Sequence, residues 1–345
     1  MAMHESLEFV KACQLIGKDR HLVQAAGGNI SLKISNRLMV IKSSGVDLSE
    51  VTRDNGYCIV DYNLISDYIK SEKNLTFSLK AEKKYNSALL KSLSSGNNLK
   101  PSIEAGFHAL LDKAIIHTHP ILVNSILCSK NAKDIMNNIF GKNNFGWVPY
   151  ETPGIGLSKG IDLLTKKFAD ENKPRKIMFL ENHGLIVCGK KLSECVLSTK
   201  NIIKSIKDYF KIENLSLNSL YNFKYFKIEN SGSKKFKSNP VKIFMKNPDN
   251  MELLNGYVFP DSVVYCHCGF SFNKASANKI ALYDDGSVVL PQNSAINPEK
   301  MMETLAAWVS LLLLMNQFSE PKYISEQECN NIKNMESEKY RQKVG

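Results

Sequence analysis

The sequence has no hydrophobic run long enough to cross a bilayer. Its longest apolar stretch, residues 305–315, has about half of the ~20 residues that a membrane-spanning helix needs. Residues 1–17 carry acidic and polar side chains between the apolar ones, so we expect no signal peptide. We therefore expect neither a membrane partner nor a secreted protein.

The sequence also lacks a paired cysteine framework. Its eight cysteines are scattered over 345 residues, which favours free thiols in a reducing, cytoplasmic setting. The one tight cluster, Cys266-His267-Cys268, has a single residue between its cysteines, whereas zinc-binding pairs leave at least two. We interpret it as alternating residues of a strand that includes 262–266.

Acidic residues are too few to balance the basic ones. Lys plus Arg is 45 against 34 for Asp plus Glu, which gives a net charge of +11. Residues 200–246 contribute +8 of this, from eleven lysines and three acids. No arginine-rich recognition helix or aromatic RNA-binding motif accompanies them. We interpret the excess as compositional and expect no nucleic-acid partner, although a basic chain also suits phosphorylated metabolites.

Length and composition are those of a globular protein. Hydrophobic residues make up 43% and charged residues 23%, which excludes a disordered chain, a collagen and a coiled-coil rod. No internal repeat is present. The length suits two domains. A polar, Lys-rich linker or excursion at 213–240 divides a first domain, 1–212, from a second unit, 241–345, which we call the C-terminal extension.

Patterning predicts an α/β/α first domain and a smaller α+β extension. Apolar periodicity, capping residues and turn residues place the elements. In the first domain we expect helices at 5–17, 61–70, 80–94, 103–111, from 120, 158–170 and 192–211, and strands at 30–32, 38–42, 114–118, 176–180 and 185–188. In the extension we expect strands at 262–266, 279–283 and 287–290, a helix at 298–314 and one charged helix after 325.

Three histidines are candidate metal ligands. His117 and His119 are two residues apart on a predicted strand, where such residues point to the same face and can bind one ion. His183 follows another predicted strand and precedes Gly184, which lets the backbone turn tightly. Three histidines with one open position describe a catalytic zinc site. Each histidine alone is more often a hydrogen-bonded core or surface imidazole.

Glu104 is the candidate catalytic acid/base. It precedes His117 by thirteen residues and lies in the first turn of the helix for which Ser102 is the expected N-cap. A carboxylate near an enolate can carry the proton that C–C bond cleavage requires. The alternative is an ordinary surface pair with His108, four residues on along the same helical face.

Two glycine-rich turns, at 27–29 and 44–45, are candidate anion sites. Such turns expose backbone N–H groups and short polar side chains, and a serine at a helix start adds a donor. Neither turn matches a Walker A loop or a dinucleotide fingerprint. The candidate anion-binding residues are Gly28, Asn29, Lys42, Ser44, Gly45 and Ser102.

Taken in order, five short motifs resemble the class II aldolase/adducin family over about residues 5–212. Two further motifs resemble the extension of larger, rhamnulose-phosphate-aldolase-like members. The five are Ala26-Gly-Gly-Asn-Ile-Ser31, Lys42-Ser-Ser-Gly-Val-Asp47, Pro101-Ser-Ile-Glu104, His117-Thr-His119-Pro and Glu181-Asn-His-Gly184, and the two are Phe259-Pro-Asp261 and Glu338-Lys-Tyr-Arg341.

The resemblance implies a three-layer α/β/α fold with a mixed, largely antiparallel central sheet, and subunits assembled as a homotetramer. It implies one divalent ion per subunit, zinc with manganese as the alternative, held by His117, His119 and His183. Glu104 would be the acid/base. Substrate phosphate would be held at the two glycine turns and Ser102.

The reaction that the resemblance implies is reversible cleavage of a ketose phosphate to dihydroxyacetone phosphate and an aldehyde, with the ion stabilising an enediolate. Ile103 departs from the family pattern, because fuculose-phosphate-type members usually have a second serine there. Lys42 is our candidate replacement for that phosphate donor. Tyr150 is a candidate contact to the aldehyde part of the substrate.

Other members of the family leave alternatives open. A decarboxylase of a phosphorylated 3-oxo sugar acid or a sugar-phosphate epimerase would use the same site. Glutamate at 104 favours an aldolase or a decarboxylase, because pentulose-phosphate epimerases generally have aspartate there. A non-catalytic adducin-like scaffold is a further alternative, against which the presence of all three histidines and the acid speaks.

Overall fold

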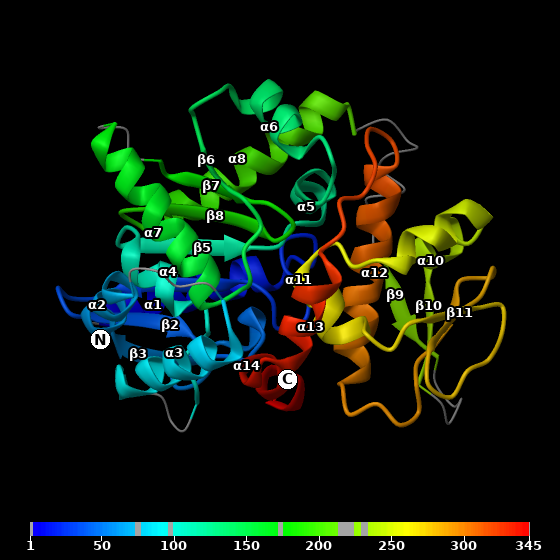
Figure 1. Cartoon of the computed structure of the whole chain (residues 1–345), viewed down its shortest axis with the longest axis horizontal. Coiled ribbons are helices and arrows are strands. Elements are labelled where there is room, and N and C mark those ends of the chain that lie inside the picture. The colour runs from blue at the N-terminus through cyan, green and yellow to red at the C-terminus, as the bar shows by residue number, and fades with distance from the viewer. Residues whose placement is uncertain are drawn as a thin grey trace.

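The computed structural model describes residues 3–72, 77–95, 99–171, 175–212, 224–228 and 234–344. They form two β-sheets with helices packed around them (Figure 1). The larger sheet has eight strands in the order β4-β3-β2-β1-β5-β8-β7-β6, and the smaller has five in the order β11-β12-β13-β10-β9.

The larger sheet and its helices come from the first 212 residues. Its strands are β1 (Asn29–Lys33), β2 (Leu38–Lys42), β3 (Tyr57–Asp61), β4 (Leu93–Ser95), β5 (Ala114–Thr118), β6 (Gly146–Val148), β7 (Ile177–Leu180) and β8 (Gly184–Gly189). The helices are α1 (Met3–Gly17), a 3-10 turn (Leu48–Glu50), α2 (Tyr62–Ser71), α3 (Leu79–Lys91), α4 (Ala105–Leu110), α5 (Ile121–Leu127), α6 (Ala132–Phe140), α7 (Ile155–Asp170) and α8 (Leu192–Phe210).

Two helical layers cover this sheet, because its strands alternate apolar side chains between two faces. On β5, Ala114 and Ile116 belong to the hydrophobic cluster that includes α1, α5 and α8. Ile115, between them, packs with Phe107 of α4 and Ile161 of α7. Among the described pairs in this sheet only β6 and β7 run parallel. The predicted three-layer fold with a largely antiparallel sheet is confirmed.

The remaining elements form the smaller sheet and its helices. They are β9 (Tyr225–Lys227), β10 (Lys235–Ser238), α10 (Asn239–Phe244), a 3-10 helix (Pro248–Asn255), α11 (Pro260–Cys266), β11 (Phe270–Phe272), β12 (Ile280–Leu282), β13 (Ser287–Val289), α12 (Pro298–Met315), α13 (Glu326–Asn334) and α14 (Glu336–Val344).

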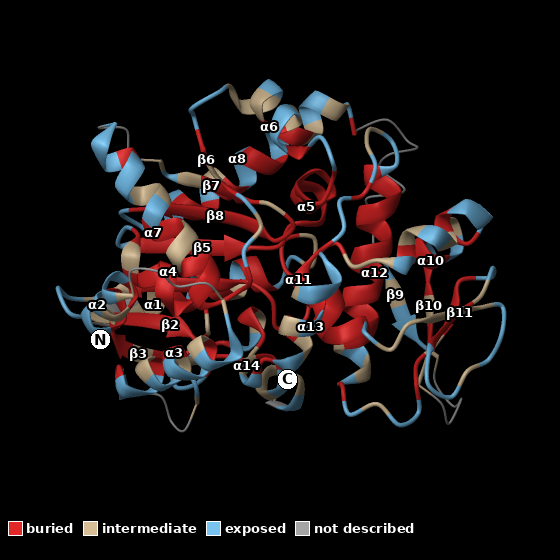
Figure 2. Ribbon diagram, viewed as in Figure 1, coloured by how far each residue is buried: buried red, intermediate tan, exposed pale blue. Residues whose placement is uncertain are grey.

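Helix α12 joins the two halves. Every residue from Met301 to Met315 is buried, and the helix is red along most of its length in Figure 2. It packs against α5, α10 and α11, and one hydrophobic cluster includes side chains of both halves. Of the predicted linker, 213–223 and 229–233 lie outside the described residues, and the rest contains β9 and β10. The domain boundaries stay a prediction.

Two predicted elements of the extension are wrong. Residues 262–266 belong to helix α11, so Cys266 and Cys268 do not alternate along a strand. All seven residues of α11 are buried, and a short run with no polar face does not distinguish a helix from a strand. The single charged helix expected after 325 is two helices, α13 and α14. Among the described residues, no helix is both long and apolar enough to span a bilayer.

Candidate metal centre and active site

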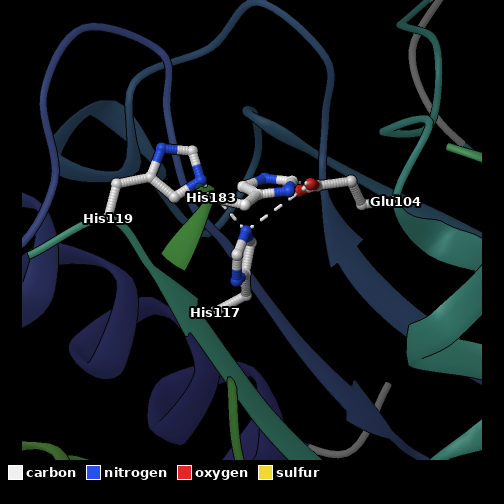
Figure 3. A group of neighbouring side chains, drawn as sticks. All are labelled: Glu104, His117, His119 and His183. Atoms are coloured by element: carbon white, nitrogen blue, oxygen red, sulfur yellow. Dashed lines mark hydrogen bonds and ion pairs between the residues drawn. The ribbon is translucent and has the colours of Figure 1, made fainter. Parts of the chain in front are cut away.

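The three histidines come from the facing ends of two neighbouring strands. His117 is in β5, His119 follows the end of β5, and His183 is in the turn between β7 and β8. Because β5 pairs antiparallel with β8, with His117 opposite Ile186, the end of one strand meets the start of the other. Glu104 directly precedes α4, and its side chain points at the imidazoles (Figure 3).

These four side chains converge on one point. One ligand atom from each lies within 4.8 Å of all the others, and all four residues are buried. The Nε2 atoms of His117 and His119 are 3.0 Å apart. Glu104 Oε1 lies 3.5 Å from His117 Nε2 and 3.2 Å from His183 Nε2. The structure thus brings together the four residues that the sequence singled out.

The hydrogen bonds of the outer ring nitrogens show that this cluster suits a cation. His117 Nδ1 lies 3.0 Å from the Leu185 carbonyl, and His119 Nδ1 lies 2.8 Å from Asp261 Oδ2. A carbonyl and a carboxylate only accept, so each Nδ1 is the donor in its hydrogen bond. The Nε2 atoms, on the other side of each ring, face each other at 3.0 Å. This arrangement, with a carboxylate beside it, fits a divalent ion.

Protonation states in the cluster also suit a cation. Burial opposes ionisation of Glu104, but His117 and His183 outweigh it and hold its pKa well below the ordinary value. Burial lowers the pKa of His183 to about 4. An ionised carboxylate and a neutral imidazole are the forms that bind metals.

The alternative assignment of Glu104 to a surface pair with His108 is wrong. His108 is fully buried, and its Nδ1 lies 2.7 Å from Ser31 Oγ. Burial lowers the pKa of His108 to about 3, so this imidazole is neutral. The expected N-cap is corrected, because α4 begins at Ala105 with Glu104 as its N-cap residue, and the Ser102 hydroxyl accepts from the Glu104 N–H at 3.2 Å just before the helix.

The turn that carries His183 is fixed on both sides. The His183 carbonyl accepts from Asn124 Nδ2 at 3.0 Å. The Asn182 amide donates to the carbonyls of Val258 and Lys322 at 2.8 and 2.6 Å. A Cβ on Gly184 would lie 2.5 Å from the Thr118 carbonyl, so glycine is needed there. The reason differs from the tight turn expected from the sequence: Gly184 has no positive φ, and it is the close approach to Thr118 that excludes a side chain.

A pocket opens beside the four side chains. Gly28 and Gly45 both adopt positive φ there, at 69° and 80°, which favours glycine in each turn. Glu104, His119 and His183 line the pocket, together with all six candidate phosphate residues: Gly28, Asn29, Lys42, Ser44, Gly45 and Ser102. Ile103, at the departure from the family pattern, lines it too.

Lys42 connects the two glycine turns. Its Nζ donates to the Ala26 carbonyl at 2.9 Å and to the Val46 carbonyl at 2.8 Å. Burial lowers the pKa of this ammonium to about 8. Lys42 thus holds the shape of the candidate phosphate site, and its direct contact with phosphate stays a prediction.

Tyr150 is not among the described residues that line this pocket. Its hydroxyl is buried and has no hydrogen-bond partner in the described part of the chain, and its backbone N–H donates to Glu181 Oε2 at 3.2 Å. Burial raises its pKa well above the ordinary value. Its proposed contact with substrate has no support from the pocket.

Sequence reasoning missed the contribution of the C-terminal extension to the pocket, including three charged residues. Asp261, Glu338 and Arg341 line the pocket with Glu104, His119 and His183, although they lie in α11 and α14. Phe259-Pro-Asp261 and Glu338-Lys-Tyr-Arg341 had been recognised as motifs, but no spacing in the sequence connects them with His119. The available signal was Asp261 within the otherwise largely apolar α11, whereas Glu338 and Arg341 do not stand out in the charged sequence of α14.

Comparison with known proteins agrees with this geometry. Residues 7–209 match the model of the class II aldolase and adducin N-terminal domain. This match covers more than half of the chain, so the protein belongs to the class II aldolase and adducin family. The family assignment made from the five motifs is confirmed.

Two curated relatives and one solved structure illustrate the range of similarity. The chain is 31% identical over 215 residues to the uncharacterized oxidoreductase YuxG of Bacillus subtilis, covering 59% of this chain but only 29% of that protein. It is 27% identical over 146 residues to the 3-oxo-tetronate 4-phosphate decarboxylase of Haemophilus influenzae, covering 39% of this chain and 67% of that protein. A class II aldolase domain from Thermoplasma acidophilum shares 25% identity over 59% of this chain and 92% of that domain, with a TM-score of 0.49.

Proposed function

We propose that this protein is a metal-dependent lyase that reversibly cleaves a ketose phosphate to dihydroxyacetone phosphate and an aldehyde. The observation that carries this proposal is the convergence of His117, His119, His183 and Glu104 beside a pocket lined by two glycine turns. The three imidazoles would hold the ion, which we propose to be zinc, with manganese as the alternative. When bound, such an ion polarises carbonyl and hydroxyl oxygens as a Lewis acid.

Glu104 is the proposed proton carrier. Retro-aldol cleavage needs a proton taken from a substrate hydroxyl and a proton delivered to the carbon that loses its neighbour. Glu104 Oε1 faces the cluster, and Oε2 accepts from Asn29 Nδ2 at 2.6 Å, which fixes the orientation of the carboxylate. The carboxylate is ionised before reaction, so it is ready to accept the first proton.

The glycine turns are the proposed phosphate site. Backbone N–H groups at turns and serine hydroxyls are suitable donors to a phosphate dianion. Ser44, Gly45 and Ser102 lie in the same pocket as Glu104, so phosphate bound there would leave the reacting carbons near the acid/base. Lys42 adds positive charge at this end of the pocket.

A decarboxylase is the second candidate, favoured by the Haemophilus influenzae relative. Loss of carbon dioxide from a phosphorylated 3-oxo acid needs the same ion and phosphate site, and a proton for the carbon left behind. Release of carbon dioxide from such a substrate, with no cleavage of ketose phosphates, would select this candidate. A sugar-phosphate epimerase is a further alternative on the same residues.

Setting and assembly are part of the proposal. All eight cysteine thiols are free, which supports a reducing compartment such as the cytoplasm. We also propose a homotetramer, as the family resemblance implies, and a small phosphorylated sugar as the ligand.

The deciding experiment is metal analysis of the purified protein before and after EDTA, with cleavage of pooled ketose phosphates assayed on the same samples. About one zinc or manganese per chain, with release of dihydroxyacetone phosphate that EDTA abolishes, is the expected result. Metal without cleavage would select the decarboxylase or epimerase. Absence of metal would select the adducin-like scaffold.

A further inference from the structure

The C-terminal extension reaches the metal cluster through one carboxylate. Asp261 is in the first turn of α11 and accepts from His119 Nδ1 on Oδ2 at 2.8 Å. Its other oxygen, Oδ1, accepts from Arg341 Nη2 at 2.5 Å. His119 and Asp261 are 142 positions apart in the chain, so this contact exists only because the extension packs against the first half.

We propose that Asp261 and Arg341 are positioning residues of the metal centre, so that the extension completes a site that the first 212 residues begin. The proposal rests on the proposed function for the presence of the ion. A carboxylate on the second nitrogen of a metal-binding histidine fixes the tautomer and orientation of the ring and raises its basicity. Asp261 does this for His119, and Arg341 fixes Asp261.

Arg341 is itself held on two sides. Its Nη1 donates to Glu338 Oε2 at 3.2 Å, one helical turn earlier in α14. Its guanidinium carbon lies 5.4 Å from the centre of the Tyr265 ring in α11. The forked guanidinium therefore bridges α11 and α14, a geometry that the single ammonium of a lysine does not reproduce.

A purely structural salt bridge explains this placement poorly. The side chains of Asp261 and Arg341 are only 5% and 14% exposed. Taking two charges out of water costs free energy that their attraction barely offsets, so a buried pair is a weak source of stability. Orientation of His119 by Asp261 Oδ2, the oxygen that Arg341 does not bind, would explain why this costly pair is present.

The extension also holds both glycine turns of the pocket. Glu303 Oε2 in α12 accepts from the Ala25 N–H at 2.9 Å, next to the first turn. Lys300 Nζ, also in α12, donates to the Gly45 carbonyl at 3.2 Å and pairs with Asp47 Oδ1 at 2.8 Å. Contacts of the extension thus fix the phosphate end of the pocket as well as the metal end.

The test is zinc affinity of the full-length Asp261→Asn protein, measured by competition with a chelator. Asparagine keeps the shape of the side chain but removes its charge, and we expect the zinc dissociation constant to rise about 10- to 100-fold. Cobalt(II) added to the metal-free protein should give an altered absorption spectrum. Asp285→Asn is the matched control, because Asp285 is exposed in the extension and pairs with Lys237, so its zinc affinity should equal that of wild type.

Arg341→Lys is the second variant, in case Asp261→Asn fails to fold. It keeps the positive charge but loses the fork, and we expect a smaller rise in the zinc dissociation constant. Unchanged zinc affinity in the folded variants, with only a lower unfolding midpoint of the metal-free protein, would show a structural ion pair and overturn the inference. Wild-type protein that binds neither zinc nor manganese would overturn the proposed function too. The two proposals can also fail separately. If wild-type protein cleaves no ketose phosphate but Asp261→Asn still binds zinc more weakly than wild type, the inference is supported and only the proposed reaction is rejected.

Discussion

Asn29 lies opposite His117 in the β1–β5 ladder, and its amide donates to Glu104 Oε2 at 2.6 Å. One strand pair therefore fixes the relative positions of a glycine turn, a proposed metal ligand and the proposed acid/base. Asn29 leaves Oε1 of Glu104 directed at the imidazoles, 3.2 Å from His183 Nε2. Oε2 of Glu104 is thus held by Asn29, while Oε1 is the oxygen that would exchange a proton with substrate.

Glu104→Gln should keep the metal and lose most of the turnover. The glutamine oxygen can still accept from Asn29, so the geometry is retained, but the amide cannot carry a proton at pH 7. We expect kcat to fall by about 10²- to 10⁴-fold with close to wild-type zinc content, measured by steady-state kinetics and metal analysis. Glu320→Gln, at an exposed pair with Lys130, is the control. Turnover at the wild-type level would refute the role of Glu104.

His119→Ala should lose metal and activity together. The substitution removes one of three imidazoles and leaves Asp261 Oδ2 without its donor, so zinc affinity should fall by more than the 10- to 100-fold expected for an outer-sphere change. Equilibrium dialysis against zinc, followed by the cleavage assay, measures both losses. His267→Ala, outside the pocket lining, should retain both. A His119→Ala protein that keeps one zinc per chain would exclude His119 as a ligand.

Two of the proposed metal ligands and the glycine turns could be predicted from the sequence because their spacing is local. His117 and His119 share a strand, and each glycine turn adjoins its strand within a few residues. His183 and Glu104 needed the family resemblance to connect them. Once β5 pairs with β8, the three histidines meet without further information.

The contribution of the extension could not be predicted, because nothing local encodes it. Asp261 lies in a helix that we expected to be a strand, since its buried neighbours show no polar face. Its two partners are 142 positions before it and 80 positions after it. Tertiary packing of α11 against α12, α13 and α14, and of α14 near α3, decides these contacts.

Lys42→Met should raise the KM for a phosphorylated substrate. It removes the two hydrogen bonds that join the glycine turns and a positive charge from the pocket, so we expect at least a ~10-fold rise, equivalent to about 1.4 kcal/mol of binding. Lys33→Met is a close control, because Lys33 Nζ also donates to two backbone carbonyls, of Ala109 and Leu111, but away from the pocket.

Both lysine variants should lose stability, by about 1–3 kcal/mol for the carbonyls left without donors. Only Lys42→Met should change KM. Urea unfolding and initial-rate kinetics on the two variants separate these effects. An unchanged KM in folded Lys42→Met protein would reject Lys42 as the replacement for the missing serine.

Metal-free protein should lose stability as the pH falls from about 6.5, partly because of His108. Burial lowers the pKa of His108 from 6.5 to about 3 in the folded state. The unfolded chain therefore takes up a proton at this residue below pH 6.5, while the folded chain does not, so the free energy of unfolding falls with pH until about pH 3. Burial of His183 acts in the same direction.

His108→Gln should remove the His108 part of this loss. Glutamine can still bond Ser31 Oγ but does not titrate, so between pH 6.5 and 4 the variant should lose about 2–3 kcal/mol less than wild type. Urea unfolding of EDTA-treated proteins at several pH values in this range measures the difference, and the contributions of carboxylates and of His183 cancel in the comparison. Parallel pH profiles for wild type and His108→Gln would show that His108 is protonated in the folded protein, which its full burial beside Ser31 argues against.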